Sequence, residues 1–102
     1  MRIGSSVPVL KIGWKLMYQV SYTITDPLGL HARPAGFLVK EAQKYEDNEI
    51  TLKYGEKTAY LKKLFMVMQL GVKQNDLITV EVEGPNEQKV AEELLAYLQN
   101  NL

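Results

Sequence analysis

The stretch Gly29-Leu30-His31-Ala32-Arg33-Pro34-Ala35 contains the only histidine of the chain and separates two different hydrophobic patterns. The residues before it alternate as in a strand, and the residues after it recur at helical spacing, so His31 should stand at the N-terminus of a helix. The first amides of a helix lack intrahelical acceptors and, with the helix dipole, form a site for an anion. Arg33 would add a permanent positive charge and a forked set of donors to that site.

His31 is suited to nucleophilic chemistry in this location. A neutral imidazole is a nucleophile at physiological pH, and beside an anion site it can accept a phosphoryl group on nitrogen. We therefore interpret His31 as a phosphorylatable histidine. The alternative is a lone histidine that only caps the helix or is satisfied at the surface.

The same stretch resembles the active-site signature of HPr, the histidine phosphocarrier family of the bacterial phosphoenolpyruvate:sugar phosphotransferase system. The resemblance covers about residues 17 to 102, in the order and spacing of that family. The further residues that carry it are Leu38, Val39, Ala42, Tyr45, Leu61, Lys62, Val67, Met68, Leu70 and Gly71.

Length and composition limit the possible functions. A chain of 102 residues is the size of one domain, and its 12 basic and 12 acidic side chains cancel. No basic excess is available for binding nucleic acid or an anionic membrane. The absence of cysteine excludes disulfides and thiol chemistry, one histidine leaves no histidine metal cluster, and no apolar run approaches the ~20 residues of a membrane span. We expect a cytoplasmic protein without a metal ion.

Residues 1–16 show neither clean alternation nor helical periodicity, and they contain two glycines, one proline and three basic residues. Their short, interrupted apolar runs argue against a signal peptide. Because the resemblance begins at Met17, we expect residues 1–16 to be an N-terminal extension or leader before a domain of residues 17–102. The alternative is a segment that pairs with the sheet edge or a partner, anchored by Trp14.

The hydrophobic patterns along residues 17–102 predict an α+β domain. The resemblance implies an open-faced β-sandwich, in which a four-stranded antiparallel sheet carries three helices on one face. The expected elements, in order, are a strand over 18–25, a helix over 32–45, a hairpin over 50–61, a short helix over 62–70, a strand over 78–83 and a helix that Gly84-Pro85-Asn86-Glu87 starts, with Pro85 near its first position.

The short helix has more apolar residues than one buried face can hold, so some of them should be exposed. Surplus Phe and Met side chains on a short helix are typical of a surface that binds partners, although a core role for Val67 and Leu70 remains open. The apolar residues are Leu64, Phe65, Met66, Val67, Met68 and Leu70.

The resemblance also implies a mechanism. His31 matches the histidine that takes a phosphoryl group on Nδ1 from phospho-enzyme I and passes it to a sugar-specific enzyme IIA domain. Arg33 matches the arginine that neutralises the phosphate, which the amides of Ala32 and Arg33 would contact. Leu64, Phe65 and Met68 match the docking patch for both partners. The protein would then be a monomeric carrier during sugar uptake, without a cofactor, and not an enzyme.

Two residues depart from the family pattern. Some members carry a regulatory serine where this chain has Lys63, and a position that is often glycine is Met66 here. These departures support an alternative function, a regulatory paralogue that acts by protein docking. An independent hydrolase or kinase is disfavoured, because the sequence fixes no second titratable residue beside His31 and contains no Gly-rich nucleotide loop.

Overall fold

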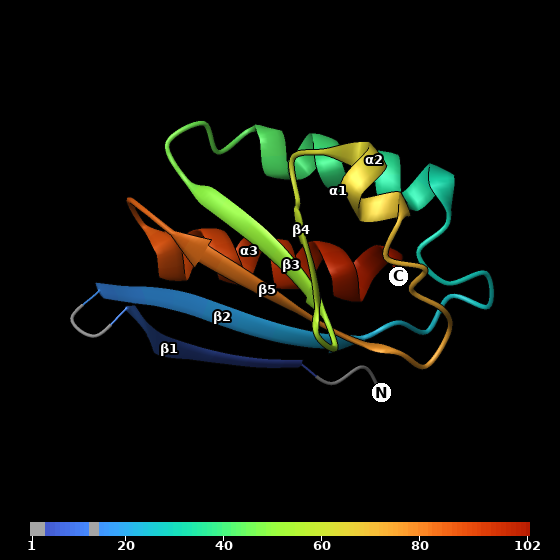
Figure 1. The fold of residues 1–102 in the computed structure, drawn as a ribbon, viewed down its shortest axis with the longest axis horizontal. Helices are drawn as coiled ribbons and strands as arrows, with labels where there is room; N and C mark the ends of the chain where they lie inside the picture. The colour runs from blue at the N-terminus through green and yellow to red at the C-terminus, as the bar shows by residue number, and fades with distance from the viewer. Residues whose placement is uncertain (1–3, 13–14) are drawn as a thin grey trace.

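The computed structural model describes residues 4–12 and 15–102, which form one antiparallel sheet with three helices on one face (Figure 1). The strand order is β1-β2-β5-β3-β4. The strands are β1 (Gly4–Ile12), β2 (Lys15–Thr23), β3 (Glu49–Tyr54), β4 (Lys57–Tyr60) and β5 (Leu77–Glu83), and the helices are α1 (Ala32–Gln43), α2 (Leu64–Met68) and α3 (Glu87–Asn101).

The α+β class and the placement of the helices are confirmed, but the expected sheet of four strands is wrong by one. Strand β1 pairs antiparallel with β2, with Gly4 opposite Tyr22 and Val9 opposite Met17. Antiparallel pairing joins backbone N–H and C=O groups. The edge of β2 offers these groups to a neighbouring strand with any side-chain pattern. Pro8 is tolerated because β1 is an edge strand.

The leading segment thus pairs with the sheet edge, as the alternative interpretation proposed. Trp14, the anchor named in that interpretation, lies outside the described residues. The division into residues 1–16 and residues 17–102 stays a prediction.

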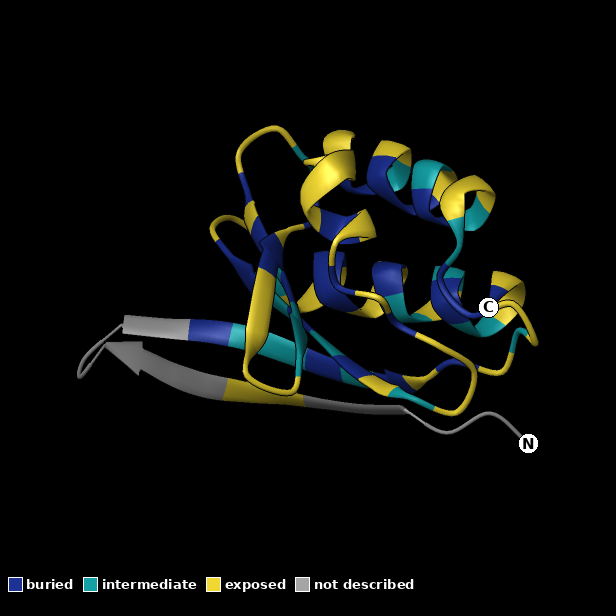
Figure 2. Cartoon of the chain, turned by 45° about the vertical axis from the view of Figure 1, so that its right-hand side comes forward, coloured by how far each residue is buried: buried dark blue, intermediate teal, exposed yellow. Residues whose placement is uncertain are grey.

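The core lies between the sheet and the helices, as Figure 2 shows by the buried residues on their facing sides. Val20 and Tyr22 of β2 and Ile24 just after it are buried, so the alternation expected over residues 18–25 is confirmed, but β2 itself starts at Lys15 and ends at Thr23. They pack in one cluster with residues of all three helices, among them Leu38 of α1, Val67 of α2 and Leu94 of α3.

The bounds of α1 differ from the expected helix at its C-terminal end. The helix ends at Gln43, and Lys44 caps it, so Tyr45 lies just outside. Tyr45 still packs against the core, and its hydroxyl donates a hydrogen bond to Glu93 of α3 at 2.7 Å. Burial, followed by this bond to Glu93, raises the pKa of Tyr45 to about 12, so at neutral pH the hydroxyl keeps its proton and joins the segment after α1 to α3.

A cluster of hydrogen bonds stabilises the loop between α1 and β3. Lys62 Nζ donates to the carbonyl oxygens of Tyr45 at 2.6 Å and Asn48 at 2.7 Å. The buried Asn48 side chain in turn donates to the carbonyl oxygens of Glu83 and Pro85 at 3.1 and 2.8 Å. These bonds tie the loop before β3 to the segments that precede α2 and α3.

Candidate functional site

His31 is the N-cap residue of α1, as the sequence predicts. Its backbone is extended, with φ −81° and ψ 178°, and its side chain makes no cap hydrogen bond. The carbonyl oxygen of His31 accepts the first helical bond from the Ala35 amide at 3.0 Å. The imidazole is therefore left available for other chemistry beside the amides of Ala32 and Arg33, which have no acceptor within the helix.

The loop before His31 is held by local bonds around Asp26. The Leu28 amide donates to Asp26 Oδ1 at 2.9 Å, and the Gly29 amide donates to the Asp26 carbonyl oxygen at 2.9 Å. This is an Asx-type turn, in which a short carboxylate side chain organises the backbone two residues ahead. The sequence Asp26-Pro27-Leu28-Gly29 therefore forms a turn between β2 and α1.

Gly29 fixes the loop against the segment that follows α2. It has φ +69°, and a Cβ atom there would lie 2.6 Å from the Val72 carbonyl oxygen and 2.7 Å from the Lys73 Cα atom. The next amide, that of Leu30, donates to the same Val72 oxygen at 3.1 Å. Only glycine permits this close approach without displacing backbone, so the histidine loop and the end of α2 are held as one surface.

The end of α3 closes the other side of the loop. The Leu102 backbone oxygen accepts hydrogen bonds from the amides of Thr25 and Asp26 at 2.7 and 3.0 Å. The Thr25 hydroxyl donates to the same oxygen at 2.9 Å. The last turn of α3 is thereby positioned beside His31.

These contacts create a hollow of about 220 Å³ at the N-terminus of α1. Within it, Asp26 Oδ2 lies 3.6 Å from His31 Nε2. Burial, followed by the nearby Glu41 carboxylate, raises the pKa of Tyr97, which remains a neutral hydroxyl at physiological pH. The residues that line the hollow are Asp26, His31, Arg33, Pro34, Phe37, Tyr97 and Asn101.

His31 and Arg33 both line this hollow, Ala32 is the first residue of α1, and the hollow adds residues that the sequence analysis missed. Asp26 had a signal, because it is a carboxylate five residues before the histidine in a turn motif. Tyr97 and Asn101 had none, since they are separated from His31 by more than 60 residues of sequence and reach the site only through the packing of α3.

The short helix α2 presents the exposed apolar surface that its composition predicts. Phe65 is 84% exposed, and Leu64, Met66 and Met68 are also exposed, whereas Val67 and Leu70 are buried. Lys63 is the N-cap residue of this helix and is itself exposed.

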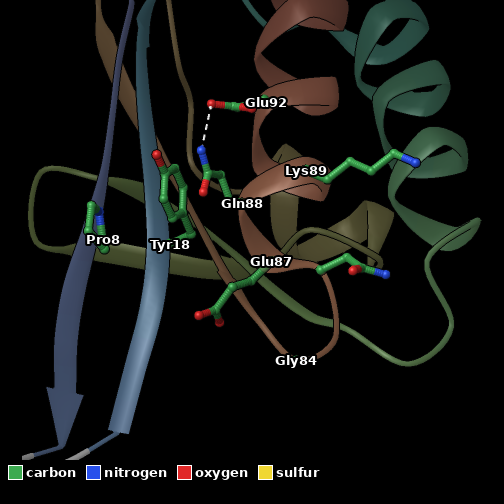
Figure 3. A pocket seen from close by; sticks show the side chains of 8 residues that line it. Pro8, Tyr18, Gly84, Glu87, Gln88, Lys89 and Glu92 are labelled. Carbon is green, nitrogen blue, oxygen red and sulfur yellow. Dashed lines mark hydrogen bonds between the residues drawn. The ribbon is translucent and has the colours of Figure 1, made fainter.

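A larger hollow of about 630 Å³ lies between β1, β2 and the N-terminus of α3 (Figure 3). Pro8, Tyr18 and Gln88 line it, and Gln88 donates a long hydrogen bond of 3.4 Å to Glu92. It lies at the opposite end of α3 from Tyr97 and Asn101, so it takes no part in the histidine site.

Within residues 4–12 and 15–102, no group of three or more His, Cys, Asp or Glu side chains is arranged to hold a metal ion. Among the helices of this same part of the chain, none is long and apolar enough to span a membrane.

Comparison with known proteins identifies the family. The family model described as "PTS HPr component phosphorylation site" matches residues 18–100. The chain belongs to the HPr family. HPr proteins are phosphocarriers of the phosphotransferase relay and not catalysts, and this chain is one of them. The residues matched to the HPr model start after β1, so β1 lies outside the matched segment.

Relatives and solved structures agree with this assignment. The phosphocarrier protein HPr of Buchnera aphidicola subsp. Baizongia pistaciae is 44% identical over 82 residues, 80% of this chain and 95% of that protein. The crystal structure of an HPr from Bacillus anthracis str. Ames matches with a TM-score of 0.75 and 31% identity, covering 81% of this chain and 98% of that chain. An HPr dimer from Thermoanaerobacter tengcongensis matches with a TM-score of 0.63 and 30% identity, covering 71% of this chain and 82% of that chain.

Proposed function

We propose that His31 accepts the phosphoryl group on Nδ1 from phospho-enzyme I and donates it to sugar-specific enzyme IIA domains in the cytoplasm. The observation that carries this proposal is the position of His31, the only histidine of the chain, at the N-terminus of α1 in the hollow that Arg33 also lines. Amides at a helix N-terminus and a guanidinium favour a dianionic phosphate.

The transfer needs no cofactor at this site. The Nδ1 lone pair of His31 forms a bond to phosphorus while the bond between phosphorus and the donor nitrogen breaks, and its electron pair returns to the donor imidazole. Arg33 and the amides of Ala32 and Arg33 would hold the phosphate oxygens. Transfer to enzyme IIA repeats the same exchange with His31 as the donor.

The surface that includes α2 and the histidine loop supplies a docking site for both enzyme I and enzyme IIA. Leu64, Phe65 and Met68 are exposed on α2, and the bonded pair of loops at Gly29 and Val72 connects α2 to the histidine loop. A small apolar surface beside the reacting group suits transient complexes. We propose that the carrier works as a monomer.

The proposal is tested by incubating the full chain with enzyme I and phosphoenolpyruvate. We expect a mass increase of one phosphoryl group that is lost in acid and that maps to the peptide containing residues 29–35. No increase, or an increase that maps to another peptide, would overturn the assignment of His31.

A regulatory paralogue is the second candidate, and the identity of Lys63 favours it. Lys63 caps α2 at the position matched to the regulatory serine, and it has no hydroxyl to phosphorylate. Sugar uptake restored in a strain that lacks its own carrier would decide for transport. Docking to a regulatory protein without such restoration would decide for the paralogue.

Arg33→Ala is expected to slow phosphoryl transfer about ten- to a hundredfold, because it removes a charge-assisted hydrogen bond of about 1.5–3 kcal/mol. The fold should be unchanged, since Arg33 is exposed. Rapid-quench kinetics with phospho-enzyme I and enzyme IIA measure both directions of transfer. Equal rates for the variant and the wild type would remove Arg33 from the mechanism.

Phe65→Ala is expected to weaken binding of enzyme I by about 1–3 kcal/mol, the scale of an interface anchor. Its effect on the free energy of unfolding should be small, because the side chain is 84% exposed. Leu70→Ala is the matched control, since Leu70 is buried beside α2 and its loss should cost about 2–5 kcal/mol of stability. Calorimetric titration and urea unfolding separate the two effects. Unchanged affinity in Phe65→Ala would place the docking surface elsewhere.

A further inference from the structure

Asp26 is held beside the imidazole of His31 by several bonds. Its Oδ1 atom accepts the Leu28 amide at 2.9 Å, while its own amide donates to the Leu102 oxygen at 3.0 Å. Its carbonyl oxygen accepts the Gly29 amide at 2.9 Å. With one carboxylate oxygen and both backbone groups engaged, the other carboxylate oxygen, Oδ2, is directed to His31 Nε2 at 3.6 Å.

The charge of Asp26 acts on one nitrogen of the ring. A separation of 3.6 Å is longer than a direct hydrogen bond, so the interaction is electrostatic. A carboxylate on the Nε2 side stabilises a proton on Nε2, which leaves the lone pair of a neutral imidazole on Nδ1. Arg33 and Tyr97 are the other titratable groups that line the hollow, and Tyr97 is neutral.

We propose that Asp26 is a positioning residue that selects the His31 tautomer with its proton on Nε2 and so presents Nδ1 to the phosphoryl donor. The inference rests on the proposed function of His31, and it explains from this structure why one ring nitrogen would react. Phosphoryl transfer to this tautomer requires no base. As the bond between Nδ1 and phosphorus forms and the donor bond breaks, the proton stays on Nε2, and the resulting imidazolium faces the Asp26 carboxylate.

Asp26→Asn separates this role from the structural role of the side chain. The asparagine oxygen can still accept the Leu28 amide and preserve the turn, but its NH₂ group would then face Nε2. A donor facing Nε2 favours the tautomer with the proton on Nδ1. A purely structural Asp26 would tolerate this substitution with no change in the tautomer.

The test is long-range ¹H–¹⁵N NMR of the unphosphorylated full chain, at a pH where the ring is neutral. One histidine in the sequence makes the two ring nitrogens unambiguous. The reference is the same protein unfolded in urea. Asp47→Asn, an exposed carboxylate in the loop between α1 and β3, is the control for the general loss of one negative charge.

We expect the ratio of Nε2-protonated to Nδ1-protonated tautomer to be about 1.5- to 5-fold higher in the folded wild type than in urea, the range for an exposed charge interaction. Asp26→Asn should bring the ratio to the urea value or below it, and Asp47→Asn should leave it at the wild-type value. An unchanged ratio in Asp26→Asn, or equal ratios in the folded and unfolded wild type, would overturn the proposal.

Phosphoryl transfer to Asp26→Asn should slow about two- to fivefold. A changed tautomer ratio with an unchanged transfer rate would also overturn the positioning role. Because the NMR measurement uses unphosphorylated protein, its failure is distinguishable from the failure of His31 to accept a phosphoryl group.

Discussion

His31→Ala is expected to abolish phosphorylation by phospho-enzyme I and to leave the domain folded. The variant lacks the nucleophilic nitrogen, and the chain contains no second histidine that could replace it. The stability should change by less than about 0.5 kcal/mol, because the imidazole is partly exposed and makes no cap hydrogen bond. Intact-mass spectrometry measures the phosphorylation, and urea unfolding measures the stability.

His31→Gln provides the matched control for this result. It keeps a polar side chain of similar size at the N-cap, yet it also lacks a nucleophilic imidazole. Both variants should fold like the wild type and show no acid-labile phosphate. Phosphorylation of either variant at the wild-type level would mean that another residue is the acceptor.

Gly29→Ala is expected to cost about 2–4 kcal/mol of stability and to displace the histidine loop. The left-handed backbone costs an L-residue about 1–2 kcal/mol, and the new Cβ atom would lie 2.6 Å from the Val72 carbonyl oxygen. Backbone atoms cannot rotate away as a flexible side chain can, so the loop or the segment after α2 must move. Urea unfolding and the rate of phosphoryl transfer should both report the change.

The Gly71→Ala variant separates the cost of the left-handed backbone from the cost of the contact with Val72. Gly71 has φ +70°, nearly that of Gly29, but a Cβ atom there meets nothing within 4 Å. This variant should therefore lose only the conformational part, about 1–2 kcal/mol. Equal losses of stability in the two variants would show that the contact with Val72 is unimportant.

Local patterns carried the prediction of most elements. Alternation placed Val20, Tyr22 and Ile24 in the core, and helical spacing placed Leu38 there, because each pattern has the period of the element that buries it. Helix ends depend less on these local patterns. Helix α1 ends at Gln43, two residues before the expected Tyr45. Tyr45 packs against the core from outside the helix, so its apolar side chain did not show that the helix continued to it.

The sequence by itself determined the α+β class, the single histidine at a helix N-terminus with Arg33 beside it, and the apolar excess of α2, because these depend on residue type and spacing along a few turns of chain. The tertiary structure alone decided that residues 4–12 add a fifth strand and that Tyr97 and Asn101 close the histidine site. It also decided that one oxygen of Asp26 faces Nε2. Backbone pairing at a sheet edge leaves no side-chain pattern, and contacts between distant segments are set by how α3 packs on the sheet.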